Sequence, residues 1–224
     1  MLPWTTLDTA ILPDGSGTLR LKQRGGEFSI MLGSNELMNS RLSGSEEALA
    51  GLTCQRLAGR PRPSLLIGGL GMGFTLRAAL AALPPDAAVE VAELIPEVAQ
   101  WARGPMTPVF GGCLDDPRVT LSIVDVAAAI AAAEDRYDAI LLDVDNGPEG
   151  LTIAANDRLY GEAGLGIAKA ALRPGGVLAI WSQGPDHGFT RRLKAAGFAT
   201  EEHSVRASRT GRGARHVIWL ATRR

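Results

Sequence analysis

The spacing of hydrophobic residues along the chain changes at about residue 45. Before that point, residues 18–23 and 27–32 alternate apolar with polar side chains, which is typical of strands that bury one face. Arg24-Gly25-Gly26 lies between the two runs and supplies the positive φ angles that a tight hairpin needs. Residues 1–44 are therefore predicted to form a small N-terminal β-hairpin segment.

From residue 45 onward, short apolar runs alternate with helical patterns. Ser45 is predicted to cap a helix that ends near Ala58, because Glu46 and Glu47 favour the positive end of a helix dipole. Strands are predicted at 64–68, 89–92, 119–124, 138–142, 177–181, 199–205 and 216–221. Helices are predicted at 75–83, 96–103, 126–133 and 189–196, with a longer one that ends at residue 172. This alternation predicts that residues 45–224 form one Rossmann-like α/β domain, with a seven-stranded, mostly parallel sheet and an antiparallel edge.

The composition is compatible with one substantial core and argues against several kinds of site. The chain has 224 residues, of which 46% are hydrophobic and 21% charged. A formal net charge of −1 gives no electrostatic reason to bind nucleic acid or an anionic membrane. Two cysteines and three histidines are scattered without metal-ligand spacing, so no metal site is expected. With no signal-peptide pattern and no apolar run of about 18 residues, a cytoplasmic protein is expected.

The most distinctive local feature is a glycine-rich turn after the apolar run Leu65-Leu-Ile. Glycine lets a backbone turn sharply and lets a ligand approach the main chain closely. The spacing lacks the G-x-G-x-x-G of dinucleotide sites and the Gly-Lys-Ser/Thr ending of phosphate loops. It favours a ligand without phosphates, such as S-adenosylmethionine, although a tight turn without a ligand is the alternative. The candidate cofactor-binding glycines are Gly68, Gly69, Gly71 and Gly73.

Two further acids follow predicted strands at the same edge of the sheet. Glu93 ends the next strand about 20 residues after the glycines, where an acid accepts hydrogen bonds from ribose hydroxyls. Asp125 closes the third strand at a level suited to the adenine amino group, although Asp also begins helices well. Both residues are therefore candidates for cofactor binding.

A pair of carboxylates follows the fourth strand, in Leu142-Asp143-Val144-Asp145. Because ligands of open α/β sheets bind beyond the carboxyl ends of the strands, Asp143 and Asp145 should face the crevice beside the glycine turn. Two carboxylates at the opening of one crevice would attract a positively charged ligand, either an amine substrate or a sulfonium. They could also accept the proton that an amine must lose before it attacks carbon, so both are candidate catalytic residues. The alternative is that they only stabilise the loop.

The motifs between residues 45 and 183 resemble those of the spermidine/spermine synthase family. Asp115-Asp-Pro-Arg118 is similar to the family's D-D-P-R, and Leu159-Tyr160 with Lys169 and Leu172-Arg-Pro-Gly-Gly176 is similar to its L-F…K…L-x-P-G-G. The resemblance implies a class I methyltransferase fold and transfer of an aminopropyl group from decarboxylated S-adenosylmethionine to a diamine, in a homodimer. It implies nucleoside binding by Glu93 and Asp125, an amine-deprotonating role for Asp143, and substrate-side positions for Glu46 (or Glu47) and Tyr160.

The departures from the family's pattern narrow the expected function. No acid lies between Gly68 and Gly73, where the family's G-G-G-D-G has the aspartate that holds the aminopropyl amine. The family's D-x-x-D-P is shortened, and no His-Glu pair occurs. We therefore expect alkyl transfer from S-adenosylmethionine, or its decarboxylated form, to a small amine, with methyl favoured over aminopropyl. A polyamine aminopropyltransferase and a catalytically silent nucleoside-binding or dimerising module are the alternatives, and the glycine spacing disfavours an NAD-linked oxidoreductase.

Overall fold

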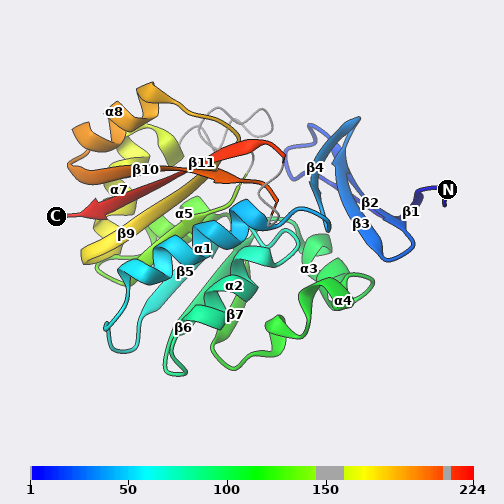
Figure 1. The fold of residues 1–224 in the computed structure, drawn as a ribbon, viewed down its shortest axis with the longest axis horizontal. Coiled ribbons are helices and arrows are strands. Elements are labelled where there is room, and N and C mark those ends of the chain that lie inside the picture. Colours follow the sequence, from blue (N-terminus) through cyan, green and yellow to red (C-terminus); the bar gives the residue numbers. More distant parts are fainter. Residues whose placement is uncertain (1, 145–158, 209–212) are drawn as a thin grey trace.

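A computed structural model describes residues 2–144, 159–208 and 213–224. The N-terminal part is an antiparallel sheet whose four strands pair in chain order, and it lies at one end of the molecule (Figure 1). Its strands are β1 (Thr5–Ile11), β2 (Thr18–Arg24), β3 (Glu27–Leu32) and β4 (Asn35–Asn39). The predicted hairpin corresponds to β2 and β3, in which Arg24 pairs with Glu27. The flanking strands β1 and β4 extend this hairpin into a sheet.

The second part is a sheet with the strand order β10-β11-β9-β8-β5-β6-β7. Its strands are β5 (Ser64–Gly68), β6 (Ala88–Glu93), β7 (Val119–Ile123), β8 (Tyr137–Leu142), β9 (Leu172–Ser182), β10 (Phe198–Arg206) and β11 (Arg215–Arg223). The five strands from β9 to β7 are parallel, whereas β11 runs antiparallel to both β9 and β10. The predicted fold class, a mostly parallel seven-stranded sheet with an antiparallel edge, is confirmed.

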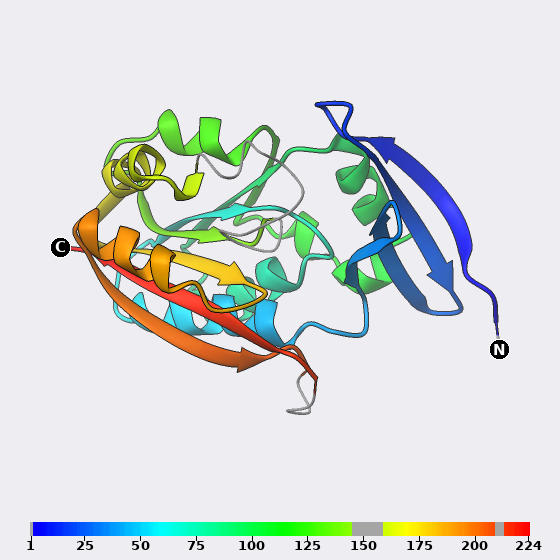
Figure 2. The ribbon, with the colours of Figure 1, turned by 90° about the horizontal axis from the view of Figure 1, so that it is seen from above.

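Helices cover both faces of this sheet, as the view from above shows (Figure 2). They are α1 (Gly44–Arg56), α2 (Phe74–Ala82), α3 (Pro96–Arg103), α4 (Thr107–Phe110), η1 (Cys113–Asp115), α5 (Val126–Ala131), α7 (Glu162–Ala171) and α8 (His187–Ala195). Helices α1, α2 and α3 pack on one face, and α5, α7 and α8 pack on the other. The short helices α4 and η1 were not predicted from the sequence.

The sheet separates two hydrophobic cores, and successive strand residues point alternately into them. On β5, Leu65 and Ile67 belong to the core under α1–α3, while Leu66 belongs to the core under α5, α7 and α8. A strand that is buried on both faces needs apolar side chains at successive positions. For this reason β5 has a continuous apolar sequence, whereas the predicted N-terminal strands alternate apolar with polar residues. The N-terminal sheet contributes Leu21 and Phe28 to the first core. The division into segments 1–44 and 45–224 stays a prediction.

The order of the strands creates a crevice between β5 and β8. The chain runs from β5 outward through β6 to β7, and then returns to β8 on the other side of β5. The connections after β5 and β8 therefore leave the sheet in opposite directions, and open α/β sheets bind ligands at such a switch point. The glycine turn follows β5, Glu93 ends β6, and Asp143 directly follows β8.

The predicted capping role of Ser45 is wrong. Helix α1 begins at Gly44 with Ser43 as its N-cap, and no side chain caps its amides. Ser45 lies within the first turn and is fully buried. Its hydroxyl donates to Glu46 Oε2 at 2.8 Å and lies 2.8 Å from His216 Nδ1 on β11. The partner on a distant strand, which no local pattern reveals, determines where this hydroxyl points.

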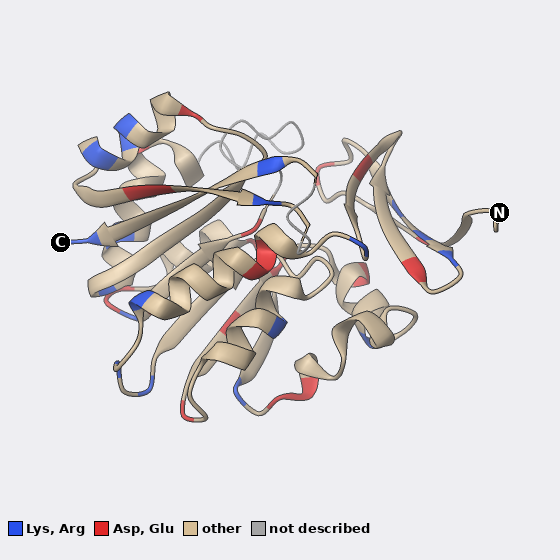
Figure 3. Cartoon of the chain, in the orientation of Figure 1, with Lys and Arg blue, Asp and Glu red and all other residues tan. Residues whose placement is uncertain are grey.

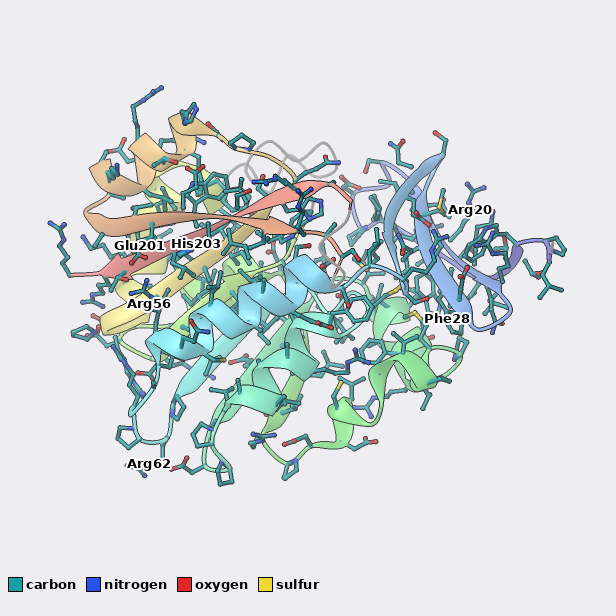
Figure 4. The ribbon with its side chains drawn as sticks, in the orientation of Figure 1. Arg20, Phe28, Arg56, Arg62, Glu201 and His203 are labelled. Carbon is teal, nitrogen blue, oxygen red and sulfur yellow. The ribbon has the colours of Figure 1, made fainter. Side chains whose placement is uncertain are left out.

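Charged side chains of both signs are spread along the described chain rather than gathered by sign (Figure 3). Figure 4 shows Arg56 on α1 beside Glu201 and His203 on β10. Arg56 forms an ion pair with Glu201, and His203 lies 3.5 Å from the same carboxylate. These contacts connect α1 to the edge strand.

Among the helices of the described residues, none has both the length and the apolar character of a membrane span.

Candidate active site

The glycine turn is fixed between the ends of β6 and β8. Gly69 has a φ of +88°, and a Cβ there would lie 2.7 Å from the backbone oxygen of Asp143. Its N–H donates to Ala92 O at 2.9 Å, and the Asp143 N–H donates to Gly68 O at 3.1 Å. Any other residue at position 69 would push the chain after β8 away. The turn therefore holds the two strand ends in contact.

Gly71 lies where the glycine turn meets both pockets of the site. Its φ is +50°, and a Cβ at this position would lie 3.0 Å from the sulfur and the terminal methyl of Met38. Met38 comes from β4, so the N-terminal sheet reaches over the turn. Gly71 lines both of the pockets described below. Its missing side chain leaves room where a ligand can approach the main chain.

Glu93 is buried, and backbone amides bind both of its carboxylate oxygens. Leu70 N–H donates to Oε2 and Ile95 N–H donates to Oε1, each at 2.8 Å. Burial raises the pKa of the Glu93 carboxyl, and these backbone hydrogen bonds oppose that effect. Each oxygen still has a lone pair for another donor. The arrangement therefore positions an acceptor for hydroxyl groups beside the glycine turn.

Asp125 both caps a helix and lines the same cavity. Its Oδ1 accepts a hydrogen bond of 2.8 Å from Ala127 N–H at the start of α5. Its side chain also lies in the wall of the first pocket together with Glu93. The position of Asp125 is therefore compatible with both interpretations from the sequence, a helix cap and an acceptor for the adenine amino group.

The first pocket encloses about 840 Å³ of space that no protein atom occupies, part of it open to solvent. One wall contains Gly69, Gly71, Glu93 and Asp125. The opposite wall is apolar and comes from the N-terminal sheet and its turns: Leu12, Leu19, Ile30, Leu32, Leu37 and Met38. This wall was not predicted from the sequence. The only sign of it was the apolar face of the predicted N-terminal strands, for which no packing partner was predicted.

The second pocket adjoins the first and contains two acids, Glu46 from α1 and Asp143 after β8. It has a volume of about 600 Å³, part of it open to solvent. The two pockets share Leu37, Met38, Gly71, Asp143 and Val144. The remaining lining of the second pocket is apolar: Leu70, Met72, Phe74 and Trp181. A ligand that spans both pockets would pass Gly71.

The two acids of the second pocket have no cationic partner among residues 2–144, 159–208 and 213–224. Asp143 Oδ2 accepts a hydrogen bond of 2.7 Å from the Thr75 hydroxyl, and burial raises the pKa of this carboxyl. Burial, and then the negative charge of Asp143, raise the pKa of Glu46 to about 7. Within the described residues, no lysine, arginine or histidine forms an ion pair with either acid. Two partly buried carboxylates of this kind favour a cationic ligand.

Comparison with curated proteins gives two kinds of relative. A polyamine aminopropyltransferase from Corynebacterium efficiens is 36% identical over 129 residues, which are 56% of this chain and 24% of the relative. Putrescine N-methyltransferase 2 from Nicotiana tabacum is 39% identical over 119 residues, 53% of this chain and 31% of the relative. The chain thus spans about a quarter to a third of the length of these relatives. No family model matches.

Comparison with solved structures covers nearly the whole chain. Spermidine synthase from Thermotoga maritima superposes with a TM-score of 0.76 and 19% identity, over 98% of this chain and 73% of that one. A probable spermidine synthase from Corynebacterium glutamicum gives a TM-score of 0.64 and 15% identity, over 97% and 79%. The chain is similar in sequence to polyamine aminopropyltransferases over about half its length, and similar in fold to spermidine synthases. The resemblance inferred from its motifs and its class I methyltransferase-like fold are both confirmed.

The structure does not bring all the predicted site residues together. Tyr160 is buried in the core under α7 and α8, edge-on to Phe189 with the ring centroids 5.6 Å apart, and lines neither pocket. Its role in substrate binding stays a prediction. Asp145 lies outside the described residues.

Two of the four glycines pack against protein side chains. A Cβ at Gly68 would lie 2.8 Å from Val126, and one at Gly73 would lie 2.6 Å from the ring of Phe110. Neither glycine lines the two pockets. Their positions explain why the turn needs them without a ligand, and their part in cofactor binding stays a prediction.

Besides the apolar wall, which includes Met38, the sequence did not predict Thr75 or Trp181 as residues of the site. Thr75 donates to Asp143, while Met38 and Trp181 line the second pocket. Thr75 lies in the first turn of the helix after the glycines, so its proximity to a strand-end acid could have been inferred. Met38 and Trp181 come from β4 and β9, and no local pattern indicates that these strands meet at the pocket.

Proposed function

We propose that the chain is a transferase that moves an alkyl group from S-adenosylmethionine, or a related sulfonium nucleoside, to a small amine. The observation that carries this proposal is the pair Glu46 and Asp143, two acids without a cationic partner in the described chain. They lie in a pocket that shares Gly71 with a second, mostly apolar pocket. The names of the curated relatives, which include putrescine and polyamine transferases, support the same class of acceptor.

The first pocket fits a nucleoside without phosphates. Glu93 would accept hydrogen bonds from ribose hydroxyls, and Asp125 would accept one from the adenine amino group. The apolar wall from the N-terminal sheet would cover the base. Gly71 would allow the donor's sulfur substituents to pass into the second pocket. When bound, the donor supplies an alkyl carbon that a positively charged sulfur activates.

The second pocket would hold the amine and prepare it as a nucleophile. Asp143 and Glu46 attract the ammonium form, and one of them must take a proton because only the neutral amine attacks carbon. Thr75 fixes one oxygen of Asp143, which limits the orientation of the bound amine. The site would also speed the transfer by holding the amine nitrogen in line with the donor's carbon–sulfur bond near Gly71.

We favour methyl transfer over aminopropyl transfer. The side chains of the glycine turn are the buried Leu70 and Met72, so the turn offers no carboxylate to the terminal ammonium of a decarboxylated donor. The relatives named putrescine N-methyltransferase agree with this choice. Aminopropyl transfer is the second candidate, because other relatives are named polyamine aminopropyltransferase. A homodimer and a cytoplasmic location stay predictions.

Calorimetric titration of the protein with both donors tests the proposal. We expect both S-adenosylmethionine and its decarboxylated form to bind, with affinities that differ by less than about tenfold, which corresponds to 1.4 kcal/mol. Methyl transfer to putrescine should then be detectable by mass spectrometry. A preference beyond about a hundredfold for the decarboxylated donor would establish the aminopropyl candidate instead. Binding of neither donor, nor of their thioether products, would contradict the proposal.

A further inference from the structure

A hydrogen-bonded chain leads from the second pocket to the C-terminal hairpin. Glu46 lines the pocket, and its Oε2 accepts a hydrogen bond of 2.8 Å from the Ser45 hydroxyl. The same hydroxyl lies 2.8 Å from Nδ1 of His216, which is 171 residues away on β11. Ser45 is fully buried, while His216 is partly exposed. The three side chains therefore form a continuous path between the pocket and the protein surface.

This path is suited to proton transfer because a serine hydroxyl is both a donor and an acceptor. With Glu46 ionised, the hydroxyl donates to Glu46 Oε2. Once Glu46 is protonated, its O–H can donate to Ser45 Oγ, and the hydroxyl can turn to donate to His216 Nδ1. His216 accepts this proton in the tautomer that carries hydrogen on Nε2. No atom in the path has to move far.

Asp143 has no comparable path within the described chain. Its Oδ2 accepts from Thr75, and the other contact of the Thr75 hydroxyl is the backbone oxygen of Glu46 at 3.5 Å. Thr75 is buried, and a backbone carbonyl cannot pass a proton onward. Among the described residues, no side chain therefore carries a proton from Asp143 onward. Glu46 therefore has a hydrogen-bonded route to the surface through Ser45 and His216, whereas Asp143 has none in the described chain.

We propose that Glu46 takes the proton of the acceptor ammonium and that Ser45 relays it to His216, which releases it to water. The inference rests on the proposed function, because it assigns the proton that amine alkylation must release. An N–H bond of the ammonium breaks as an O–H bond forms on Glu46. An O–H bond of Ser45 then breaks as an N–H bond forms on His216 Nδ1, while Ser45 gains the Glu46 proton. One proton leaves for each alkyl group transferred.

The charges around the path set the protonation states from which the relay starts. Glu46 faces the acids Asp143 and Glu47, and burial and Asp143 raise its pKa to about 7, so Glu46 is a stronger base than an ordinary carboxylate. His216 contacts Ser45 and packs roughly perpendicular to the Trp181 ring, with the two ring centroids 4.7 Å apart. Burial lowers the pKa of His216, so the imidazole is neutral near pH 7 and able to accept a proton.

Two variants interrupt the path, and each has a matched control. Ser45→Ala removes the hydroxyl, and Ser43→Ala makes the same change at the helix N-cap, whose side chain caps no amide. His216→Gln keeps a polar group that does not titrate. His203→Gln makes the same change on the neighbouring strand β10, where His203 lies near Glu201 (Figure 4). The assay is alkyl transfer to putrescine with S-adenosylmethionine and, separately, with its decarboxylated form, from pH 6 to 9.

The relay predicts that Ser45→Ala and His216→Gln lower kcat by about tenfold or more, part of the roughly 10²–10⁴-fold that a positioned base contributes. At pH 9, where Glu46 is ionised in the wild type and the variants, the KM for putrescine should change by less than about twofold, and both control variants should retain wild-type kcat. The pH profile separates a relay from a structural serine. Loss of the Ser45 hydrogen bond also raises the pKa of Glu46, so a structural serine would give full kcat again at pH 9. Loss of a relay lowers kcat across the whole range.

Recovery of kcat at pH 9, or no loss in either variant, would overturn the relay. If neither donor supports transfer to putrescine, the proposed function fails, and a second readout decides on the path. NMR titration of the His216 ring should then respond to Glu46→Gln in the wild-type background and not in Ser45→Ala, with His203 as the unaffected reference. A His216 titration that ignores Glu46→Gln would show that the path does not couple the two residues.

Discussion

The two pockets contain acidic residues in contrasting environments. In the first pocket, backbone N–H groups of Leu70 and Ile95 bind both oxygens of Glu93. In the second pocket, the negative charges of Glu46 and Asp143 each make ionisation of the other less favourable. Their side-chain partners are the hydroxyl groups of Ser45 and Thr75. The first arrangement stabilises the turn that forms the pocket. The second keeps negative charge available for a cationic ligand at the expense of stability.

The largest expected effect is that of Asp143→Asn on amine binding. Removing one charge of a buried ion pair costs about 2–5 kcal/mol, which predicts that putrescine affinity falls about 30-fold or more. The donor's affinity should change far less, because Asn can still accept the hydrogen bond from Thr75. Calorimetry with putrescine and with S-adenosylmethionine measures both, and Asp86→Asn on the exposed turn before β6 is the control. Equal losses for amine and donor would contradict separate roles for the pockets.

Glu46→Gln should stabilise the protein at neutral and higher pH. The pKa of Glu46 rises from 4.5 to about 7 on folding, so the folded state binds an extra proton between these values. The stability that this proton gives is complete below about pH 4.5 and is lost as the pH rises through about 7. The wild-type free energy of unfolding should therefore fall by up to about 3 kcal/mol over this window relative to Glu46→Gln.

Urea unfolding at pH 5 and pH 8 measures this difference, with Glu47→Gln on the same helix as the control for net charge. The two free energies should be similar for Glu46→Gln and wild type at pH 5, and Glu46→Gln should be the more stable at pH 8. A wild type that is at least as stable as Glu46→Gln at pH 8 would show that Glu46 has a cationic partner.

Glu93→Ala should have the opposite effect on stability. Two buried N–H groups lose their acceptor, at a cost of about 1–3 kcal/mol. The variant should also lose the rise in melting temperature that saturating S-adenosylmethionine gives, worth about 2.7 kcal/mol at a hundredfold excess over Kd. Differential scanning calorimetry with and without the nucleoside measures both effects. An undiminished ligand-induced rise would remove Glu93 from the nucleoside site.

The same contrast explains which parts of the site the sequence predicts. The glycine turn, Glu93 and Asp125 follow consecutive strands, and in a parallel sheet the carboxyl ends of strands meet at one edge. Asp143 follows the central strand β8 and was predicted for the same reason. These positions depend on local periodicity and on the order of the elements. The sequence contains both, and the predicted strand 64–68 and helix 96–103 match the structure residue for residue.

The residues that the sequence did not predict depend on contacts between distant elements. Ser45 reads as a helix cap, yet His216 on β11 and the carboxylate of Glu46 determine its contacts. Tyr160 resembles a substrate-side residue, but Phe189 on α8 provides a core environment for its ring. Met38 covers Gly71 only because the N-terminal sheet packs over the crevice. No local pattern records these pairings, since each joins segments that the topology alone brings together.

The most direct test of the account is a calorimetric titration with putrescine at pH 6 and pH 8, in the presence of the thioether product of S-adenosylmethionine. With the pKa of Glu46 at about 7, the ionised fraction rises about tenfold between these pH values. We predict that putrescine affinity rises by about the same factor and that Glu46→Gln removes the dependence on pH. Affinity that is the same at both pH values, or absent at both, would contradict a second pocket built for an ammonium ion.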